Sequence, residues 1–298
     1  MVELQVGTDG ATLAVTFSPA GRTAIVALHG ASAGVRRHPL YEHLHAVLPA
    51  VGVGVATFDR RGEGGSTGEA SRGRFEVQAR DALAVAAALP VDRIGLWGFS
   101  QGGWVAPIAA TMSPDVSFLT LIASTGVSPA EQMRYATAEQ TRRAGFGQDA
   151  VERALALRHR FEDWVDQPDE ETGASLYADL AAVAREPWWV TAFLPRDLPD
   201  AAGRARWMAE MDFDPVPVFA SVTVPTLLFY GTDDGWTPVD TSIAAWRRAR
   251  GEGVEVTLIP NASHELTLPD GQLAPAYEDR LVDGDEAPCR AGTRRMKP

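Results

Sequence analysis

Residues 93–110 join an apolar run, a tight turn and a helical pattern with no loop between them. The run RIGLW at residues 93–97 meets GFSQG at residues 98–102, and WVAPIAA then continues with the small residues of a buried helix. In a strand, G-x-S-x-G, helix unit, the serine sits in a strained turn that holds its hydroxyl out above the sheet. A Cβ on either flanking position would collide with the neighbouring strand or helix, which is why glycine stands there. The segment therefore predicts that Ser100 is a nucleophile.

An ordinary glycine-rich turn between a strand and a helix is the alternative for this pattern. A serine hydroxyl is a weak nucleophile until a base removes its proton, and a third group must orient that base. Two later loops offer these groups in the order acid, then histidine. GTDDGWTP follows the apolar run at residues 226–230, and PNASHE follows the run at residues 254–259. We therefore expect Ser100, an aspartate of the first loop and His264 to act together.

Apolar runs alternate with helical patterns over the first 127 residues. Strands are predicted at residues 3–6, 13–17, 23–28, 51–58, 94–97 and 117–123, and helices at residues 39–48 and 75–89. The first two strands, separated by GTDG, are expected to form a hairpin. The later runs are almost continuously apolar, which is typical of parallel strands covered on both faces. The sequence thus predicts an α/β protein with a mostly parallel sheet.

This alternation stops between residues 128 and 220, where no convincing strand is present. A capping box, SPAE, begins a helix at Ser128, and further helices are predicted at residues 149–165, 170–184 and 201–211. Strands resume at residues 225–230 and 254–259, and a short helix at 277–282 precedes a polar tail. We therefore predict three parts, at residues 1–127, 128–220 and 221–298. Because ligands of open α/β sheets bind at the carboxyl ends of the strands, where such insertions emerge, the middle part is a predicted lid.

Composition narrows the class of protein. The chain has 298 residues, of which 45% are apolar and 22% charged, as is ordinary for a globular protein. A formal net charge of −12 argues against nucleic acid or an anionic membrane surface as a partner. No apolar run approaches the length of a membrane span, and the first residues lack the pattern of a signal peptide. We expect a cytoplasmic protein.

The rare residue types exclude several cofactors. A single cysteine, Cys289, permits neither an intrachain disulfide nor a cysteine-based metal site. Lys297 is the only lysine, which excludes pyridoxal-phosphate chemistry and a P-loop. We expect no metal and no organic cofactor, and a small-molecule acyl substrate as the partner. The sequence carries no pattern that sets an oligomeric state.

Taken together, the motifs resemble those of the α/β-hydrolase superfamily over nearly the whole chain. The matching motifs are HG at residues 29–30, DRRGEGGSTG at 59–68, GFSQG at 98–102, GTDDGWTP at 231–238 and SH at 263–264. They are similar to the branch of serine esterases, thioesterases and peptidases that has a helical cap. The resemblance implies an α/β-hydrolase fold, which is a mostly parallel eight-stranded sheet with helices on both faces and an inserted all-helical lid.

The resemblance also implies a role for each candidate site residue. Ser100 matches the nucleophile, His264 the base and Asp234 the acid, because the family's acid stands three residues after the glycine and four before the proline. Asp233 is the runner-up, with hydrogen bonding inside the turn as its other role. Scaffolding roles are implied for His29, which holds the loop after its strand, and for Asp59, Arg60 and Arg61.

The tetrahedral intermediate of acyl transfer needs N–H donors for its oxyanion. The resemblance assigns these donors to the backbone N–H groups of Ala31 and Gln101, with Ser32 as the alternative to Ala31. Trp188 and Trp189 are candidates for an apolar substrate pocket beneath the lid. Packing among the lid helices is the alternative role for both tryptophans.

A serine hydrolase that cleaves an acyl ester of a small apolar substrate, through an acyl-enzyme intermediate, is the expected function. The same triad in a thioesterase, a peptidase or an acyltransferase is the alternative within enzymes. A non-catalytic hydrolase-fold protein that binds a ligand is a third hypothesis, and the intact set of Ser100, Asp234 and His264 argues against it.

Overall fold

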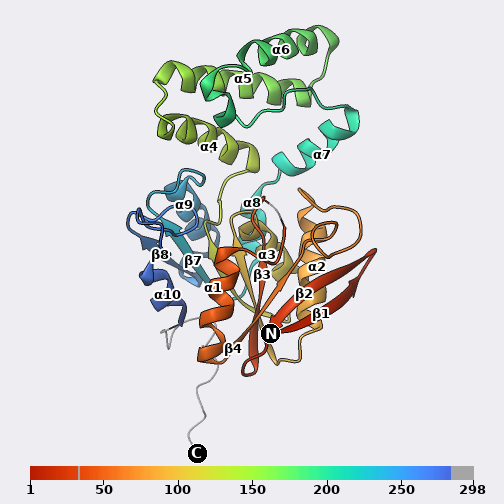
Figure 1. The fold of residues 1–298 in the computed structure, drawn as a ribbon, viewed down its shortest axis with the longest axis vertical. Coiled ribbons are helices and arrows are strands. Elements are labelled where there is room, and N and C mark those ends of the chain that lie inside the picture. The colour runs from red at the N-terminus through yellow and green to blue at the C-terminus, as the bar shows by residue number, and fades with distance from the viewer. Residues whose placement is uncertain (33, 283–298) are drawn as a thin grey trace, which may run out of the picture. The chain divides into compact units, whose positions relative to one another are not determined.

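The computed structural model describes residues 1–32 and 34–282 and contains one eight-stranded sheet (Figure 1). The predicted polar tail, with Cys289 and Lys297, lies outside the described residues. Strand order is β1-β2-β4-β3-β5-β6-β7-β8. The strands are β1 (Val2–Thr8), β2 (Ala11–Ser18), β3 (Thr23–Leu28), β4 (Val53–Phe58), β5 (Arg93–Phe99), β6 (Val116–Ile122), β7 (Thr226–Gly231) and β8 (Val254–Ile259).

The pairing of the strands confirms the predicted sheet. β1 and β2 form the expected antiparallel hairpin, and β2 pairs antiparallel with β4. All other neighbours, from β4 through β3, β5, β6 and β7 to β8, pair in parallel. Every residue of β4 and β7 is buried, as expected for parallel strands with helices on both faces. Because the parallel strands run the same way, their carboxyl ends lie along one edge of the sheet.

Helices cover both faces of the sheet. On one face, α1 (Pro39–Val47) and α10 (Pro275–Val282) share a hydrophobic core with β3, β4 and β5. The hydroxyl of Tyr277, fully buried in α10, accepts a hydrogen bond from Trp97 Nε1 at 3.0 Å, which anchors this short last helix. Four further helices lie outside this core, α2 (Phe75–Ala87), α3 (Gly102–Met112), α8 (Pro215–Ser221) and α9 (Val239–Arg250).

The sequence reading missed α8. Pro215 and Pro217 both stand in the first turn of this helix, where the backbone N–H groups have no partner within the helix. Phe219 of α8 stacks on Trp246 of α9 with ring centroids 3.8 Å apart, and both rings are fully buried. Packing against α9 therefore holds a helix that its own sequence signals only weakly.

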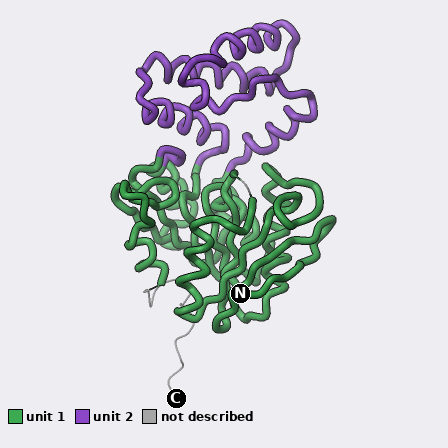
Figure 2. The backbone as a smooth tube through the Cα atoms, viewed as in Figure 1, with its two compact units in different colours: residues 1–126, 215–234, 239–298 green, residues 127–214, 235–238 purple. Residues whose placement is uncertain are grey.

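The chain divides into two compact units (Figure 2). The first consists of residues 1–126, 215–234 and 239–298, and the second of residues 127–214 and 235–238. The second unit contains α4 (Pro129–Arg143), α5 (Gln148–Asp166), α6 (Glu170–Val183), a 3-10 helix at Pro187–Thr191 and α7 (Ala201–Met211). Its first helix begins with the predicted capping box, in which Ser128 and Glu131 bond to each other's backbone N–H groups. The helical unit is therefore inserted in sequence between β6 and β7.

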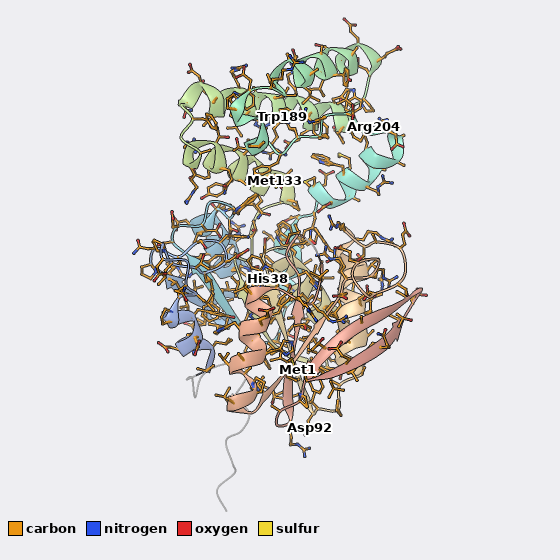
Figure 3. The ribbon with its side chains drawn as sticks, in the orientation of Figure 1. Met1, His38, Asp92, Met133, Trp189 and Arg204 are labelled. Atoms are coloured by element: carbon orange, nitrogen blue, oxygen red, sulfur yellow. The ribbon has the colours of Figure 1, made fainter. Side chains whose placement is uncertain are left out.

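Trp188 and Trp189 are buried inside the helical unit, 3% and 7% exposed. Trp189 packs with Leu157, Phe161 and Leu180, and Figure 3 shows it among the helices of this unit. Trp188 packs with Ala154 and Ala192. Both rings thus pack in hydrophobic clusters of this unit, and their part in a substrate pocket stays a prediction.

Arg158 of α5 is the centre of a buried group of hydrogen bonds in the same unit. Its guanidinium, 2% exposed, donates to Ala192 O at 2.7 Å, to Phe193 O at 3.0 Å and to Thr137 Oγ1 at 3.0 Å. These bonds hold Phe193 at a φ of 51°, which a bulky side chain rarely adopts. The ring of Phe193 is 38% exposed and lies 5.0 Å from the ring of Trp236.

Candidate active site

Ser100 occupies a strained turn between β5 and α3. Its φ of 52° lies in the left-handed region, where a serine persists only if its surroundings hold it. The backbone N–H of Ser100 donates to Ile122 O at 2.9 Å. A Cβ on Gly98 would lie 2.3 Å from the carbonyl oxygen of Gly102, and a Cβ on Gly102 would lie 2.7 Å from Leu28 O. The turn therefore closes only with glycine at both flanking positions.

His264 contacts Asp234 across two neighbouring loops. The Nδ1–H of His264 donates to Asp234 Oδ2 at 2.8 Å. The Asp234 side chain is 0% exposed and that of His264 is 15% exposed. The two loops are tied together where Asp233 N donates to Ala262 O at 2.9 Å. Asp234 is thus the aspartate whose carboxylate orients the imidazole, whereas the Asp233 side chain faces the surface.

The three sequence-predicted residues gather at the same edge of the sheet. Ser100 follows β5, Asp234 follows β7 and His264 follows β8, each at the carboxyl end of a parallel strand. Phe99, which precedes Ser100, contacts the ring of His264 with centroids 5.1 Å apart. A half-buried serine at the same sheet edge as a histidine oriented by a buried carboxylate is the set of groups that nucleophilic catalysis needs.

The two predicted oxyanion donors adjoin Ser100 from different elements. A Cβ built on Gly30 would lie 3.6 Å from Ser100 Cβ, so the turn after β3 passes beside the serine. Ala31 is the next residue of that turn and is exposed, as is Ser32. Gln101 is buried and caps the N-terminus of α3, where the helix dipole favours a negative charge.

His29 is buried below this turn and does not reach the surface. Burial, reinforced by the nearby charge of Arg60, lowers the pKa of its imidazole to about 3, so the ring is neutral at neutral pH. Its Nε2–H donates to Phe58 O at 2.7 Å, and its ring packs edge-on against those of Tyr41 and Phe58. This is the scaffolding role that the resemblance implies for His29.

Within residues 1–32 and 34–282, no three His, Cys, Asp or Glu side chains lie close enough together to hold a metal ion. Over the same residues, no helix combines the length and apolar character needed to cross a bilayer.

The comparisons with known proteins agree with this fold. The chain belongs to the alpha/beta hydrolase family, whose model matches residues 25–276. This confirms the predicted family and the α/β-hydrolase fold. Among curated proteins, no sequence matches the chain.

Solved structures with the same fold include esterases and proline iminopeptidases. An esterase from Pyrococcus furiosus has a TM-score of 0.61 at 16% identity, covering 95% of this chain and 88% of that chain. A proline iminopeptidase-related protein from Thermus thermophilus has a TM-score of 0.62 at 22% identity, covering 98% and 100%. A proline iminopeptidase from Mycobacterium smegmatis has a TM-score of 0.59 at 20% identity, covering 88% and 91%. At these identities the likeness shows the fold.

Sequence reasoning missed two features of the structure. One is the network formed by Arg60 and Glu63 beneath the turn after β3. The other is the strained, partly exposed Phe193 beside Trp236. Both depend on contacts between segments far apart in the chain, which local patterns do not reveal. The only sequence signal for the first is an arginine and a glutamate three residues apart in the DRRGEGGSTG loop.

Proposed function

We propose that this alpha/beta hydrolase is a serine hydrolase that cleaves an acyl ester of a small apolar substrate. Ser100 is the nucleophile, His264 the general base and Asp234 the residue that orients the base. The observation that carries the proposal is the 2.8 Å hydrogen bond from His264 to a fully buried Asp234, on the sheet edge that also holds the strained Ser100. A buried carboxylate is costly unless it is paired, and the bond from His264 supplies such a pairing for Asp234.

In this mechanism Ser100 Oγ attacks the carbonyl carbon of the ester while His264 takes the hydroxyl proton. The carbonyl oxygen becomes an oxyanion, which accepts hydrogen bonds from the backbone N–H groups of Ala31 and Gln101. His264 then gives its proton to the departing alkoxide, and an acyl-serine remains. Water, activated by the same histidine, attacks the acyl group and regenerates Ser100. Throughout, the charge of Asp234 stabilises the imidazolium form of His264.

We also propose that the helical unit is the lid of the enzyme. Its chain leaves the first unit after β6, and its segment 235–238 follows Asp234 directly. These two connections follow the carboxyl ends of parallel strands, which is where open α/β sheets bind their ligands.

A substrate series tests the proposed activity. The purified protein is assayed with p-nitrophenyl esters of increasing acyl length, an acyl thioester and aminoacyl p-nitroanilides that include proline. We expect kcat/KM to be highest for the esters and to rise with acyl length over the first few methylenes, because each buried methylene contributes about 0.8 kcal/mol. A preference for prolyl anilide would instead support a peptidase, an alternative that the proline iminopeptidase neighbours keep open. Turnover of none of these substrates would contradict the proposal.

A further inference from the structure

The turn after β3 is held from inside the protein by Arg60. Arg60 is 1% exposed, and its Nη2 donates to Gly30 O at 2.6 Å while its Nη1 donates to Ser32 O at 3.3 Å. These two carbonyls flank Ala31. The backbone N–H of Arg60 also donates to Gly34 O at 2.6 Å. A single residue therefore fixes three carbonyl oxygens of the turn that carries the proposed oxyanion donor.

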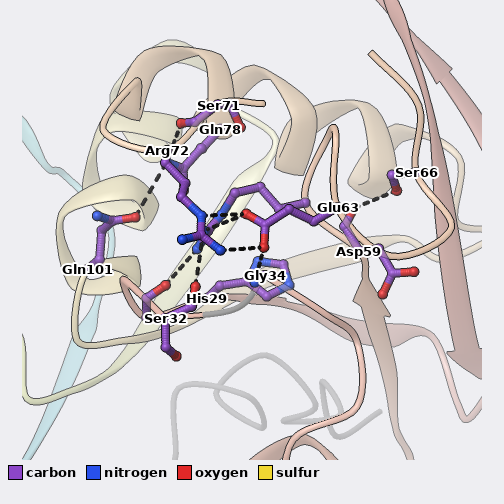
Figure 4. A network of polar contacts seen from close by, with 12 residues as sticks. His29, Ser32, Gly34, Asp59, Glu63, Ser66, Ser71, Arg72, Gln78 and Gln101 are labelled. Atoms are coloured by element: carbon purple, nitrogen blue, oxygen red, sulfur yellow. Dashed lines mark hydrogen bonds and ion pairs between the residues drawn. The ribbon is translucent and has the colours of Figure 1, made fainter. Parts of the chain in front are cut away.

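Glu63 forms further hydrogen bonds to the same turn and to Arg60. Its Oε2 accepts from Gly34 N at 2.7 Å and its Oε1 accepts from Arg60 Nη1 at 3.2 Å. Arg72 donates to both oxygens of Glu63, as Figure 4 shows. The hydrogen bonds from Arg72 lead the causes that lower the pKa of Glu63 to about 2, so this carboxylate stays charged at neutral pH. A Cβ on Gly34 would lie 2.5 Å from Arg60 Cβ, so the turn packs directly on the arginine.

Gln78 of α2 links the loop after β4 to the side chain of Gln101. Gln78 Nε2 donates to Ser71 O at 2.8 Å and to the side-chain oxygen of Gln101 at 3.4 Å (Figure 4). Gln78 and Gln101 are both buried. Ser71 is adjacent in sequence to Arg72, which pairs with Glu63. The loop after β4 thus contacts the turn after β3 directly, and it is linked to the Gln101 side chain through Gln78.

The energetics of Arg60 do not favour a role in stability alone. A buried charge pair is costly to desolvate, and well-packed apolar residues often replace one with no loss of stability. Burial lowers the pKa of the Arg60 guanidinium, which is the sign of that cost, and Glu63 opposes the shift. The buried Nε of Arg60 has no hydrogen-bond partner among the described residues. Burying the Arg60 guanidinium costs desolvation, and its Nε gains no hydrogen bond within the described part of the chain in return. Packing alone therefore does not explain why an arginine stands at this position.

We propose that Arg60 and Glu63 are positioning residues that set the geometry of the oxyanion hole. The proposal rests on the proposed function, because it acts through the backbone N–H of Ala31. Donors stabilise the oxyanion only when they lie about 2.7–3.1 Å from the place where the charge develops. Ala31 is in an exposed turn, and the planar fork of Arg60 holds the carbonyls on both of its sides in one fixed arrangement. Neither Arg60 nor Glu63 has to touch the substrate.

The test compares Arg60→Met, Arg60→Lys and Glu63→Gln with a control in the same loop. The control is Arg61→Lys, because Arg61 is also buried but pairs with Asp81 and with Asp9 O, away from the turn after β3. Three measurements are made on each variant. They are the melting temperature, the kinetics on a p-nitrophenyl ester (kcat and KM), and the affinity for a trifluoromethyl ketone. This ketone forms an oxyanion adduct with an active serine, so its affinity reports the oxyanion hole.

We expect Arg60→Met to lower kcat by about 100-fold, the loss typical of one missing oxyanion donor, and to change KM by less than about threefold. The affinity for the ketone should fall in proportion to kcat. Arg60→Lys should recover part of kcat, because an ammonium group reaches one of the two carbonyls, and Glu63→Gln should lower kcat less than Arg60→Met does. Arg61→Lys should lower the melting temperature and leave kcat and the ketone affinity close to those of the wild type.

A folded Arg60→Met protein with wild-type kcat and ketone affinity would overturn the proposal, as would an equal loss of kcat in Arg61→Lys. If Arg60→Met does not fold, kcat and the ketone affinity of Glu63→Gln and Arg60→Lys test the proposal instead. Each of these variants keeps a polar group of similar size in place. A wild-type protein that neither hydrolyses esters nor binds the ketone would refute the proposed function itself. Activity in the wild type with no effect in the variants would refute only the positioning role.

Discussion

Ser100 and His29 show how single residues of the site are adapted to opposite purposes. Ser100 is half-buried and holds a strained φ of 52°, which keeps its hydroxyl at the surface of the site. His29 lies close to it in the fold but is buried, neutral and bonded to a backbone carbonyl. Two residues of types common in catalysis therefore differ in role because of their burial and their hydrogen bonds.

The buried His29 predicts a specific dependence of stability on pH. Its folded pKa of about 3 lies below its ordinary value of 6.5, so as the pH falls below 6.5 the unfolded chain binds a proton that the folded chain refuses. The folded state is therefore disfavoured by up to about 1.4 kcal/mol for each pH unit between these two values. Above pH 6.5 this penalty is absent. We expect the free energy of unfolding of the wild type, relative to that of His29→Asn, to decrease as the pH falls from 7.5 to 4.5.

Urea unfolding of both proteins at several pH values measures this difference, and other titrating groups cancel because both chains share them. A difference between His29→Asn and the wild type that does not change with pH would show that His29 takes up a proton in the folded state.

At the scale of elements, the aromatic side chains of the helical unit differ in burial: Trp188 is buried in a core, whereas Phe193 is partly exposed. Trp188 is 3% exposed and packs in a core, with Arg153 5.3 Å above its ring. Phe193 is 38% exposed, and Arg158 fixes its backbone in a strained conformation. Strain of this kind is concentrated at functional sites, which makes Phe193 the better candidate for contact with an acyl chain.

Two substitutions, Trp188→Ala and Phe193→Gly, distinguish a packing role from contact with the acyl chain. Trp188→Ala should lower the free energy of unfolding by about 3–5 kcal/mol, because it leaves a cavity, and should leave the preference for acyl length unchanged. Phe193→Gly should alter the preference for acyl length and change stability by less than about 1 kcal/mol, because relief of the strained φ offsets the greater freedom of glycine in the unfolded chain. Thermal unfolding and the p-nitrophenyl ester series measure both effects. The opposite pattern in the two variants would return the pocket to Trp188 and Trp189.

The elements that the sequence predicts well are those whose signals are local. The strands of the sheet have continuous apolar runs, and α4 begins at a capping box that is visible in SPAE. α8 was not predicted because its two prolines conceal it, and its packing on Trp246 comes from a distant segment. Trp188 and Trp189 were ambiguous for the same reason, since no local pattern tells a buried aromatic ring from one that lines a pocket.

At the scale of the whole molecule, the site is assembled from segments up to 235 residues apart, from His29 to His264. The order of serine, acid and histidine, and their places after apolar runs, were sufficient to predict which residues meet at one sheet edge. The choice between Asp233 and Asp234 rested on the family's spacing, and the structure gives the contact to Asp234. The Arg60 and Glu63 network was not predicted, because a buried arginine has no sequence signature apart from the partners that surround it.

Covalent labelling of the folded protein with a fluorophosphonate is the most direct test that Ser100, His264 and Asp234 form a working triad. We expect one adduct per chain, located on Ser100 by peptide mass spectrometry, and none in a folded Ser100→Ala. The labelling rate should fall steeply in Asp234→Asn, as kcat does by up to about four orders of magnitude when a triad aspartate loses its charge, and little in Asp233→Asn. An absence of labelling in the wild type, an adduct on another residue, or equal rates in the two asparagine variants would contradict the account.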